Sequence, residues 1–434
     1  MNERATMKIN SQGKLEIGGI PASDLARRYG TPLYVMDETY IRQVVRAYRD
    51  TIARTYGDGN MAYASKAFSC KAIYRIMQEE GACIDVVSGG EIYTAKAAGF
   101  DLSLAYFHGN NKLEEEIELA LESGVGRFVV DSYDEIEILE RLCAARGTRQ
   151  KILIRVNPGV EAHTHTFVQT ATVDSKFGFS VRSGEALDAI LGAASKSHLD
   201  FAGLHSHIGS QIFDKQAFVL AVDVLTDFAA TLEHTHGIAV RELNLGGGFA
   251  IHYTAEDPRY NVEEYCEYVR NLTRALESDV ARKGITRPYF MIEPGRSIVG
   301  EAGVTLYTVG ARKEIRDVRT YLAVDGGMFE NIRPALYDSR YEVVLADRAF
   351  DPIEETVSVA GKCCESGDVL YKDVALPKAR RGDVLAAFST GAYGYAMSSN
   401  YNRNLTPAVV FVRDKESYVA VRRQTYDDLI RNDQ

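Results

Sequence analysis

Lys66 stands where a side chain could do chemistry, in the segment MAYASKAF (61–68). It follows an apolar, strand-like run and precedes a helix-like one. A lysine at the end of a buried strand loses much of its hydration, which lowers its pKa and makes the amine a nucleophile toward carbonyl groups. Lysines are mostly exposed in proteins, so a plain surface lysine is the alternative. We expect a desolvated Lys66 that can form a Schiff base.

Two later motifs could bind an anion. The three glycines Gly246, Gly247 and Gly248 follow a strand-like run, and EPGR (293–296) follows the next one. Glycines let the backbone approach a ligand and turn several N–H groups toward it, although a plain turn has the same composition. Arg296 could pair with an anion through two N–H groups, and Glu293 could hold a protonated ring nitrogen. Together the motifs predict a phosphate site.

The segment HSHIGSQ (205–211) contributes two histidines and a serine. His205 and His207 are two residues apart, so on a strand both point to one face. A metal pair is one alternative, but third and fourth ligands are not apparent in the sequence. A buried histidine without a function is another alternative. We expect His207 to stack on a flat ring and Ser210 to bind a phosphate.

The elements that must position these residues alternate between strands and helices, which is typical of a parallel sheet. Eight strand-like runs are spaced over about 240 residues: 61–67, 83–88, 104–109, 127–132, 151–158, 201–209, 242–249 and 289–295. Eight such units predict an α/β fold of the (β/α)8 TIM-barrel type. In such barrels the chemistry lies at the carboxyl ends of the strands, and polar residues recur there: Lys66, Ser88, His108, Asp131, Asn157, His207, Gly246 to Gly248, and Glu293 to Arg296.

The pattern changes after about residue 300, where short strands with tight turns predict an all-β domain. The strands before the first helical stretch could complete it. We therefore expect a barrel domain at 38–302 and a β domain formed by 1–37 and 303–434. One barrel connection, 160–179, is polar and threonine-rich without a helical period, and we expect it to act as a mobile flap.

Composition excludes several classes of protein. The chain is 46% hydrophobic and 25% charged, with a net charge of -10, which argues against a nucleic-acid partner. No apolar run approaches the roughly 18 residues of a membrane span, and MNERATMKIN lacks the apolar core of a signal peptide. The six cysteines have no CxxC spacing and suggest thiols in the cytoplasm rather than a disulfide framework.

A Schiff-base lysine, a phosphate site, a carboxylate for a ring nitrogen and a stacking histidine together describe a pyridoxal 5'-phosphate site. In these features the chain resembles the barrel-type pyridoxal phosphate-dependent decarboxylases, and within them the diaminopimelate decarboxylase family. The resemblance spans nearly the whole chain. Its motifs, in order, are YASKA (63–67), SGGE (88–91), GLHSHIGSQI (203–212), LGGGF (245–249), EPGRS (293–297), RPALY (333–337), CESGD (364–368) and GAYGYAM (391–397).

The resemblance implies a role for each matching residue. It makes Lys66 the Schiff-base lysine, places His207 on the cofactor ring and puts Glu293 at the ring nitrogen. The cofactor-binding set it implies is Lys66, Asp85, His207, Ser210, Gly246, Gly247, Gly248, Glu293, Gly295, Arg296 and Tyr393. The implied substrate set is Arg296, Arg333, Tyr337, Glu365 and Tyr393. No metal is implied.

The implied reaction is decarboxylation of meso-2,6-diaminopimelate to L-lysine and carbon dioxide, the last step of lysine biosynthesis. The far carboxylate of this substrate needs an arginine such as Arg333, and its far ammonium needs a carboxylate such as Glu365. Alternatives are a decarboxylase of another basic or carrier-bound amino acid, and a non-catalytic cofactor-binding regulator. A racemase of similar plan would lack CESGD and RPALY.

Cys364 is implied as the general acid that protonates the carbanion, together with the catalytic residues Lys66 and His207. In the resemblance Cys364 and Glu365 come from the second subunit of a homodimer with shared sites. One departure is visible: Lys362 and Cys363 stand where the family often has proline and a variable residue. This departure puts the stiffness of the loop in doubt, and we interpret Cys363 as a packing thiol.

Overall fold

The computed structural model describes residues 6–160 and 175–434, so most of the connection expected to be a flap lies outside the described residues. The chain forms two compact units. The barrel unit comprises Val44–Ala250 and Tyr260–Gly295, and the β unit comprises Met1–Gln43, Ile251–Arg259 and Arg296–Gln434. Among the described residues, no helix combines the length and apolar character needed to cross a membrane. The domain boundaries expected from the sequence stay a prediction.

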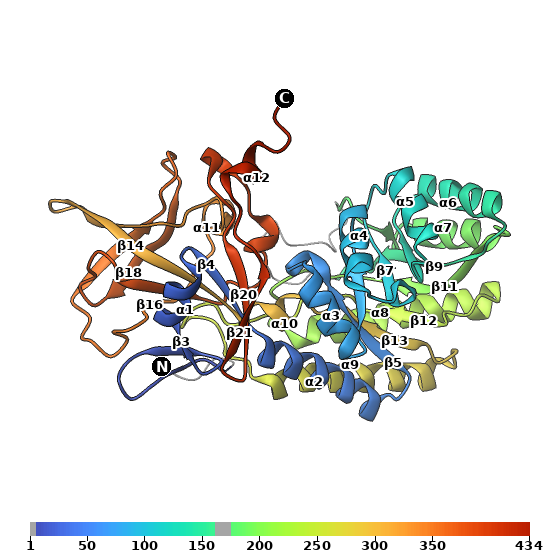
Figure 1. Cartoon of the computed structure of the whole chain (residues 1–434). Helices are drawn as coiled ribbons and strands as arrows, with labels where there is room; N and C mark the ends of the chain where they lie inside the picture. Colours follow the sequence, from blue (N-terminus) through green and yellow to red (C-terminus); the bar gives the residue numbers. More distant parts are fainter. Residues whose placement is uncertain (1–5, 161–174) are drawn as a thin grey trace. The chain divides into compact units, whose positions relative to one another are not determined.

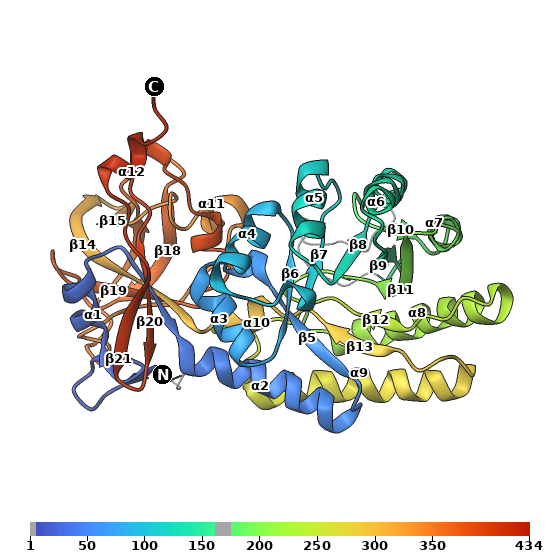
Figure 2. The same cartoon turned by 45° about the vertical axis from the view of Figure 1, so that its right-hand side comes forward.

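Eight parallel strands close the barrel (Figures 1 and 2). They are β5 (Gly59–Ala64), β6 (Cys83–Val86), β7 (Ala105–Phe107), β8 (Arg127–Val130), β9 (Gln150–Asn157), β11 (Leu199–His205), β12 (Glu242–Asn244) and β13 (Tyr289–Ile292). Each strand pairs with the next, β13 returns to β5, and β8 pairs with β9. The short strand β10 (Phe179–Ser180) is added beside β9. The predicted TIM-type barrel is confirmed.

All eight barrel strands end earlier than the sequence pattern suggested. Strand β5 stops at Ala64 and β12 at Asn244, although the apolar runs extend to residues 67 and 249. The apolar character continues because the loops that follow are themselves packed, as Ala67 and Phe249 show with 0% and 2% exposure. The reactive side chains therefore lie in the loops just beyond the strands.

Helices connect the strands and lie on the outside of the barrel (Figure 2). They are α3 (Lys71–Glu79), α4 (Gly89–Ala98), α5 (Glu114–Glu122), α6 (Tyr133–Arg146), α7 (Glu185–Ala194), α8 (Lys215–His236) and α9 (Val262–Lys283); α2 (Glu38–Thr55) precedes the first strand. The hydroxyl groups of Ser88 and Ser132 accept from backbone N–H groups in the first turns of α4 and α6. These caps start α4 and α6 directly after the loops that follow the preceding strands.

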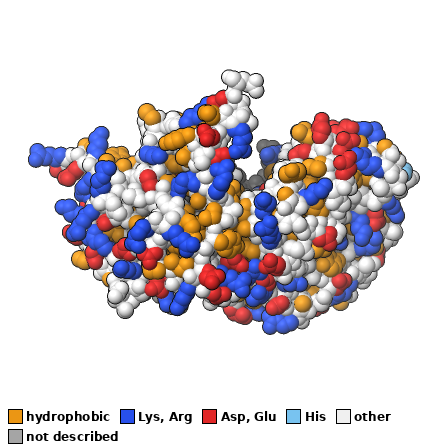
Figure 3. Space-filling model, in the orientation of Figure 1, with side chains coloured by type: hydrophobic (Ala, Val, Ile, Leu, Met, Phe, Trp, Pro, Cys, Tyr) orange, Lys and Arg blue, Asp and Glu red, His pale blue; other side chains and the backbone are white. Residues whose placement is uncertain are grey.

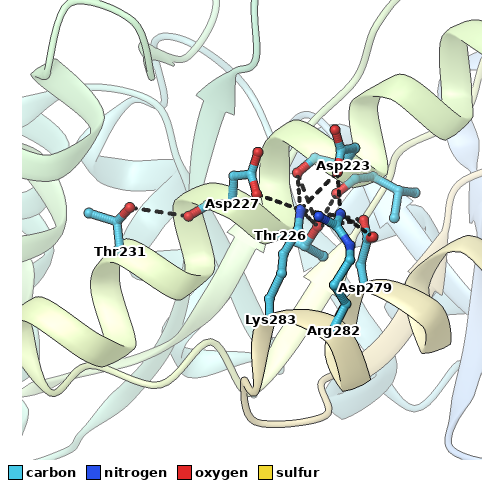
Figure 4. A network of polar contacts seen from close by, with 8 residues as sticks. Asp223, Thr226, Asp227, Thr231, Asp279, Arg282 and Lys283 are labelled. Atoms are coloured by element: carbon cyan, nitrogen blue, oxygen red, sulfur yellow. Dashed lines mark hydrogen bonds and ion pairs between the residues drawn. The ribbon is translucent and has the colours of Figure 1, made fainter.

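An ion-pair network joins the two longest barrel helices, α8 and α9 (Figure 4). The Lys283 Nζ atom lies 2.9 Å from Asp223 Oδ1, 2.6 Å from Asp227 Oδ1 and 3.5 Å from Asp279 Oδ2, and it donates to the Thr226 hydroxyl at 2.8 Å. Because only 6% of the lysine side chain is exposed, these partners compensate its lost hydration. The network fixes one helix against the other and leaves the lysine no role as a nucleophile.

The β unit is built on a nine-stranded sheet. Its strands are β4 (Leu33–Asp37), β14 (Gly303–Ile315), β15 (Arg319–Val324), β16 (Val343–Leu345), β17 (Glu355–Ala360), β18 (Val369–Leu376), β19 (Val384–Phe388), β20 (Ala408–Arg413) and β21 (Glu416–Val421). Strand β4 is antiparallel to β14 and parallel to β20. The N-terminal part of the chain therefore completes the C-terminal sheet, as expected.

Smaller elements surround this sheet. They are a three-stranded sheet of β1 (Lys8–Ile9), β2 (Leu15–Ile17) and β3 (Ile20–Pro21), and the helices α1 (Ala22–Tyr29), α10 (Arg296–Val299), α11 (Arg333–Tyr337) and α12 (Tyr426–Ile430). On the face drawn in Figure 3, acidic and basic side chains are interspersed.

A buried carboxyl group lies inside the β unit. Glu330 is 0% exposed, and its Oε1 atom accepts from the Tyr307 hydroxyl at 2.7 Å. The Tyr307 hydroxyl lies 2.9 Å from that of Tyr371, and the Tyr34 hydroxyl donates to the Glu330 backbone carbonyl at 2.5 Å. Burial raises the pKa of Glu330 to about 8, so the folded state holds this carboxyl protonated at neutral pH.

We predict that Glu330 makes folding stability depend on pH. Its pKa is higher in the folded chain, so the folded state binds the extra proton between pH 4.5 and about 8. The stabilisation is complete below pH 4.5 and is lost as the pH rises to about 8, with a slope of at most about 1.4 kcal/mol per pH unit. Urea unfolding at several pH values should show this slope reduced in Glu330→Gln.

The exposed residue Glu314 on β14 provides the control. The curve of Glu314→Gln should run parallel to that of the unchanged chain. If the curve of Glu330→Gln is equally parallel, Glu330 titrates alike in the folded and unfolded states, and the prediction is wrong.

Candidate active site

The carboxyl ends of the barrel strands bring most of the predicted cofactor residues together. Because all eight strands are parallel and the barrel is closed, these ends meet on one rim. Lys66 follows β5, Asp85 lies near the end of β6, and His207 follows β11. The glycine run follows β12 and Glu293 follows β13.

Lys66 lies in a single turn of 3-10 helix, Ser65–Ala67, immediately after β5. Its side chain is exposed, so the expectation of a desolvated lysine is wrong. The physical reason is local: the side chain leaves the sheet in the turn, while its neighbours Ser65 and Ala67 are buried. The charge of Lys66 acts on the Asp85 carboxyl and the His207 imidazole, which places the amine among the predicted cofactor residues.

The Glu293 carboxylate is held on both oxygens by three buried side chains. Asn244 Nδ2 donates to Oε1 at 2.8 Å, and His205 Nε2 lies 3.0 Å from Oε2. His108 Nε2 lies 2.8 Å from Oε1. Glu293 is 6% exposed, and each of the three partners is 5% exposed or less. Four strand ends, those of β7, β11, β12 and β13, therefore meet at one carboxylate.

The electrostatics of this cluster keep Glu293 ionised. Burial alone would raise the pKa of Glu293, but His108 and His205 outweigh it and hold the pKa well below its ordinary value. Burial lowers the pKa of His205 to about 4, so this imidazole is neutral and carries its proton on Nε2, toward the carboxylate. A fixed, buried carboxylate can hold a protonated ring nitrogen.

The structure changes which residues could form the metal site that the sequence left open. His205 faces Glu293, whereas His207 Nδ1 accepts from the backbone N–H of Gly247 at 3.2 Å, so the two histidines do not share a ligand position. His108, His205 and Glu293 are a possible ligand set. Their ligand atoms contact one another at 2.8 and 3.0 Å, so an ion could enter only if they moved apart.

His207 is suited to stacking. Burial, with a further contribution from the charge of Lys66, lowers the pKa of His207 well below its ordinary value, so the ring is neutral. The ring is partly exposed. A neutral, flat imidazole fixed through Nδ1 at the rim can lie against an aromatic ring. Ser210 lies three residues further along and is also partly exposed.

The glycine run after β12 is required by packing. A Cβ atom on Gly246 would lie 2.4 Å from the Ser206 carbonyl oxygen, one on Gly247 would lie 2.1 Å from that of Glu293, and one on Gly248 would lie 2.4 Å from that of Gly209. The loops after β11, β12 and β13 therefore fit together only with glycine here.

Two of the three glycines use their N–H groups within the protein. Gly246 N donates to Asn244 Oδ1 at 2.9 Å, and Gly247 N donates to His207 Nδ1. These two bonds fix the backbone of the loop and orient His207. The sequence pattern does not show this role. At Gly295, a Cβ atom would lie 2.8 Å from that of Ala64, so glycine is also needed next to the end of β5.

This set of donors fits pyridoxal phosphate. An exposed amine, a neutral imidazole and an ionised buried carboxylate on one rim match the aldehyde, the ring face and the ring nitrogen of that cofactor. Sequence reasoning missed His108, His205 and Asn244 as partners of Glu293. Their positions at strand ends were the available signal.

The predicted substrate residues of the β unit form a separate cluster. Arg296 and Arg333 are each 8% exposed. The ring centre of Tyr393 lies 4.8 Å from the guanidinium carbon of Arg296 and 5.5 Å from that of Arg333, and Tyr337 lies 5.3 Å from Arg333. Tyr393 has a φ of 61°, in the left-handed region, which is a strained conformation typical of functional positions. The structure therefore brings these four residues together.

The loop 361–368, which we call the cysteine loop, carries Cys364 and Glu365 with both side chains exposed. The buried carboxylate of Asp368 fixes the loop by accepting from Met328 N at 2.6 Å and Cys363 N at 2.7 Å. The Asn402 side chain accepts from Cys364 N at 2.8 Å. The loop is thus held without the proline that the family often has.

Cys363 is partly buried and accepts weakly from Asn404 Nδ2 at 3.6 Å. Burial raises the pKa of the Cys363 thiol to about 11, so the thiol is neutral at physiological pH. These properties favour the packing role expected for Cys363. All six cysteines are unpaired.

Comparison with known proteins agrees with this geometry. Residues 41–300 match the family model of the pyridoxal-dependent decarboxylases, pyridoxal binding domain. Diaminopimelate decarboxylase of Bacillus subtilis is 48% identical over 428 residues, which cover 99% of this chain and 97% of that protein. Diaminopimelate decarboxylase of Staphylococcus aureus is 45% identical over 429 residues, which cover 99% of both chains.

A solved structure extends the comparison to the fold. The crystal structure of diaminopimelate decarboxylase from M. jannaschii in complex with L-lysine superposes with a TM-score of 0.90 at 34% sequence identity, over 99% of this chain and 98% of that one. The similarity spans both the barrel unit and the β unit. The chain therefore belongs to the diaminopimelate decarboxylase family of pyridoxal phosphate-dependent enzymes.

Proposed function

We propose that Lys66, Glu293 and Cys364 are the central residues of the reaction that this chain catalyses, decarboxylation of meso-2,6-diaminopimelate to L-lysine and carbon dioxide with pyridoxal 5'-phosphate. The observation that carries the proposal is the buried Glu293 carboxylate, held ionised on the rim where Lys66 presents its amine. The barrel domain, 38–302 in the sequence-based division, would bind the cofactor.

Each barrel residue has one task in this proposal. Lys66 supplies the amine that binds the aldehyde carbon of the cofactor, and His207 covers the ring face. Glu293 keeps the ring nitrogen protonated, because its own proton affinity is low. The other members of the proposed cofactor set are Asp85, Ser210, Gly246, Gly247, Gly248, Gly295, Arg296 and Tyr393. When bound, the cofactor supplies an electron sink for the charge left as carbon dioxide departs.

The substrate residues lie in the β unit. Arg333 would pair with the far carboxylate of the substrate, assisted by Arg296, Tyr337 and Tyr393, and Glu365 would pair with the far ammonium. Cys364 Sγ would deliver the proton to the carbon that lost carbon dioxide. These pairings require a substrate with an amino group and a carboxylate at each end. They therefore favour diaminopimelate over substrates with one carboxylate.

We also propose a homodimer in which Cys364 and Glu365 serve the site of the partner subunit. The cysteine loop supports this proposal, because its backbone is fixed by Asp368 and Asn402 while both reactive side chains point to solvent. A rigid loop that presents unused reactive groups is suited to a contact with a second copy. We propose the cytoplasm as the compartment, in keeping with six thiols.

We predict that Lys66→Ala abolishes the visible absorbance of the bound cofactor at its resting position and lowers decarboxylation by about 100-fold or more, because the amine is lost. Absorbance spectra and carbon dioxide release measure both effects. The control Lys71→Ala removes an exposed lysine five residues further along. Full activity of Lys66→Ala would overturn the proposal.

We predict that Arg333→Ala weakens diaminopimelate binding while leaving the cofactor absorbance intact. Removing one partner of a desolvated charge pair costs roughly 2–5 kcal/mol, which is about 30-fold or more in affinity. Glu365→Ala should act similarly. Arg340→Ala, which removes a mostly exposed arginine in the same region, is the control. An unchanged affinity in Arg333→Ala would show that this residue does not bind the substrate.

We predict that mixing inactive Lys66→Ala and Cys364→Ala proteins restores activity. A hybrid dimer would contain one site with both residues intact, so random exchange would give at most about a quarter of the activity of the unchanged enzyme. Mass spectrometry of differently tagged subunits should confirm the exchange. If hybrids form and no activity returns, the shared site is wrong.

A further inference from the structure

The two buried arginines of the β unit are linked by tyrosines that the sequence analysis did not identify. Arg296 Nη1 donates to the Tyr253 hydroxyl at 2.5 Å, and Arg333 Nε donates to the Tyr341 hydroxyl at 2.9 Å. The rings of Tyr253 and Tyr341 meet edge to face, with centres 5.4 Å apart. The ring centre of Tyr393 lies 4.8 Å from the guanidinium carbon of Arg296 and 5.5 Å from that of Arg333.

These contacts close a ring of five side chains. Its order is Arg296, Tyr253, Tyr341, Arg333 and Tyr393. Each arginine has one nitrogen bonded to a phenol and its guanidinium carbon over the ring of Tyr393. A guanidinium group has five N–H donors in a rigid fork, so one bond to a phenol can orient the whole group for a ligand.

The ring carries positive charge that the phenols do not cancel. Burial raises the pKa of Tyr341 to about 12, so its hydroxyl stays neutral at physiological pH. In residues 6–160 and 175–434, Arg333 forms no ion pair with a carboxylate, and its Nη2 atom donates to Ser339 Oγ at 3.4 Å. A buried cation held by neutral groups alone favours an anionic ligand.

We propose that Tyr253 and Tyr341 are positioning residues that set both guanidinium groups to receive one carboxylate of the substrate, so that the chain selects amino acids with a carboxylate at the far end. The inference rests on the proposed function, in which Arg333 binds that carboxylate. It adds that the phenol hydroxyls determine how tightly the carboxylate is bound.

The hydroxyls matter because they fix the arginines before the substrate arrives. Without its phenol partner, the Arg333 fork can rotate, and binding must then order it again. A hydrogen bond to a charged group that is lost from a buried site should lower affinity by about 10-fold or more. The ring packing survives in phenylalanine variants, since only the oxygen is removed.

The test compares two ligands that differ by one carboxylate, L-lysine and 1,5-diaminopentane, binding to the holoenzyme. The ratio of their dissociation constants, measured by calorimetry, reports the recognition of the carboxylate. In Tyr341→Phe and Tyr253→Phe this preference for L-lysine should fall about 10-fold each. Affinity for the diamine and cofactor absorbance should stay unchanged, and for diaminopimelate KM should rise while kcat changes little.

The control is Tyr34→Phe, which removes a buried phenol of the same unit whose hydroxyl bonds to a backbone carbonyl and not to an arginine. Tyr253→Phe serves as the second variant if Tyr341→Phe does not fold. If Arg333→Ala abolishes the preference but neither phenylalanine variant changes it, the inference is wrong and the proposed function stands. If Arg333→Ala leaves the preference unchanged, the proposed role of Arg333 itself fails.

Discussion

One buried carboxylate determines much of the barrel rim. Glu293 can stay ionised in an apolar barrel only because Asn244, His205 and His108 surround it, and each comes from a different strand end. These contacts require the strands to meet in one register, which the closed order of the sheet supplies. The same closeness explains why the neighbouring loops must use glycine. The ionised state of Glu293 and the close backbone packing of the rim therefore depend on the same arrangement of strand ends.

The sequence predicted the fold and the strand-end positions of the candidate residues, because both leave local patterns. Apolar runs alternating with amphipathic stretches identified the barrel, and polar residues after each run located its reactive rim. What local patterns cannot show is the direction of a side chain after the strand ends. Lys66 was expected to be desolvated, yet in the turn that follows β5 its side chain is exposed. Gly246 and Gly247 were expected to bind an anion, yet their N–H groups bind within the protein.

Contacts between distant segments were the other limit. Tyr253 and Arg296 are 43 positions apart, and nothing in the residues around Tyr253 indicates a partnership with an arginine. The cysteine loop shows the opposite case, in which a departure in sequence has no structural cost. Lys362 and Cys363 stand where the family often has proline and a variable residue, and Asp368 fixes the backbone here by accepting from two N–H groups. A hydrogen-bonded carboxylate can replace the covalent rigidity of proline.

The position of β4 in the sheet has a consequence for how the chain folds during synthesis. Strand β4 ends at Asp37, but its neighbours β14 and β20 begin at Gly303 and Ala408, so the ribosome makes the whole barrel before either partner exists. At about 5–20 residues per second, the strand waits on the order of tens of seconds with unpaired edges. The five residues of β4 are all buried in the finished protein. During this interval they form an aggregation-prone segment that chaperones or early barrel folding must protect.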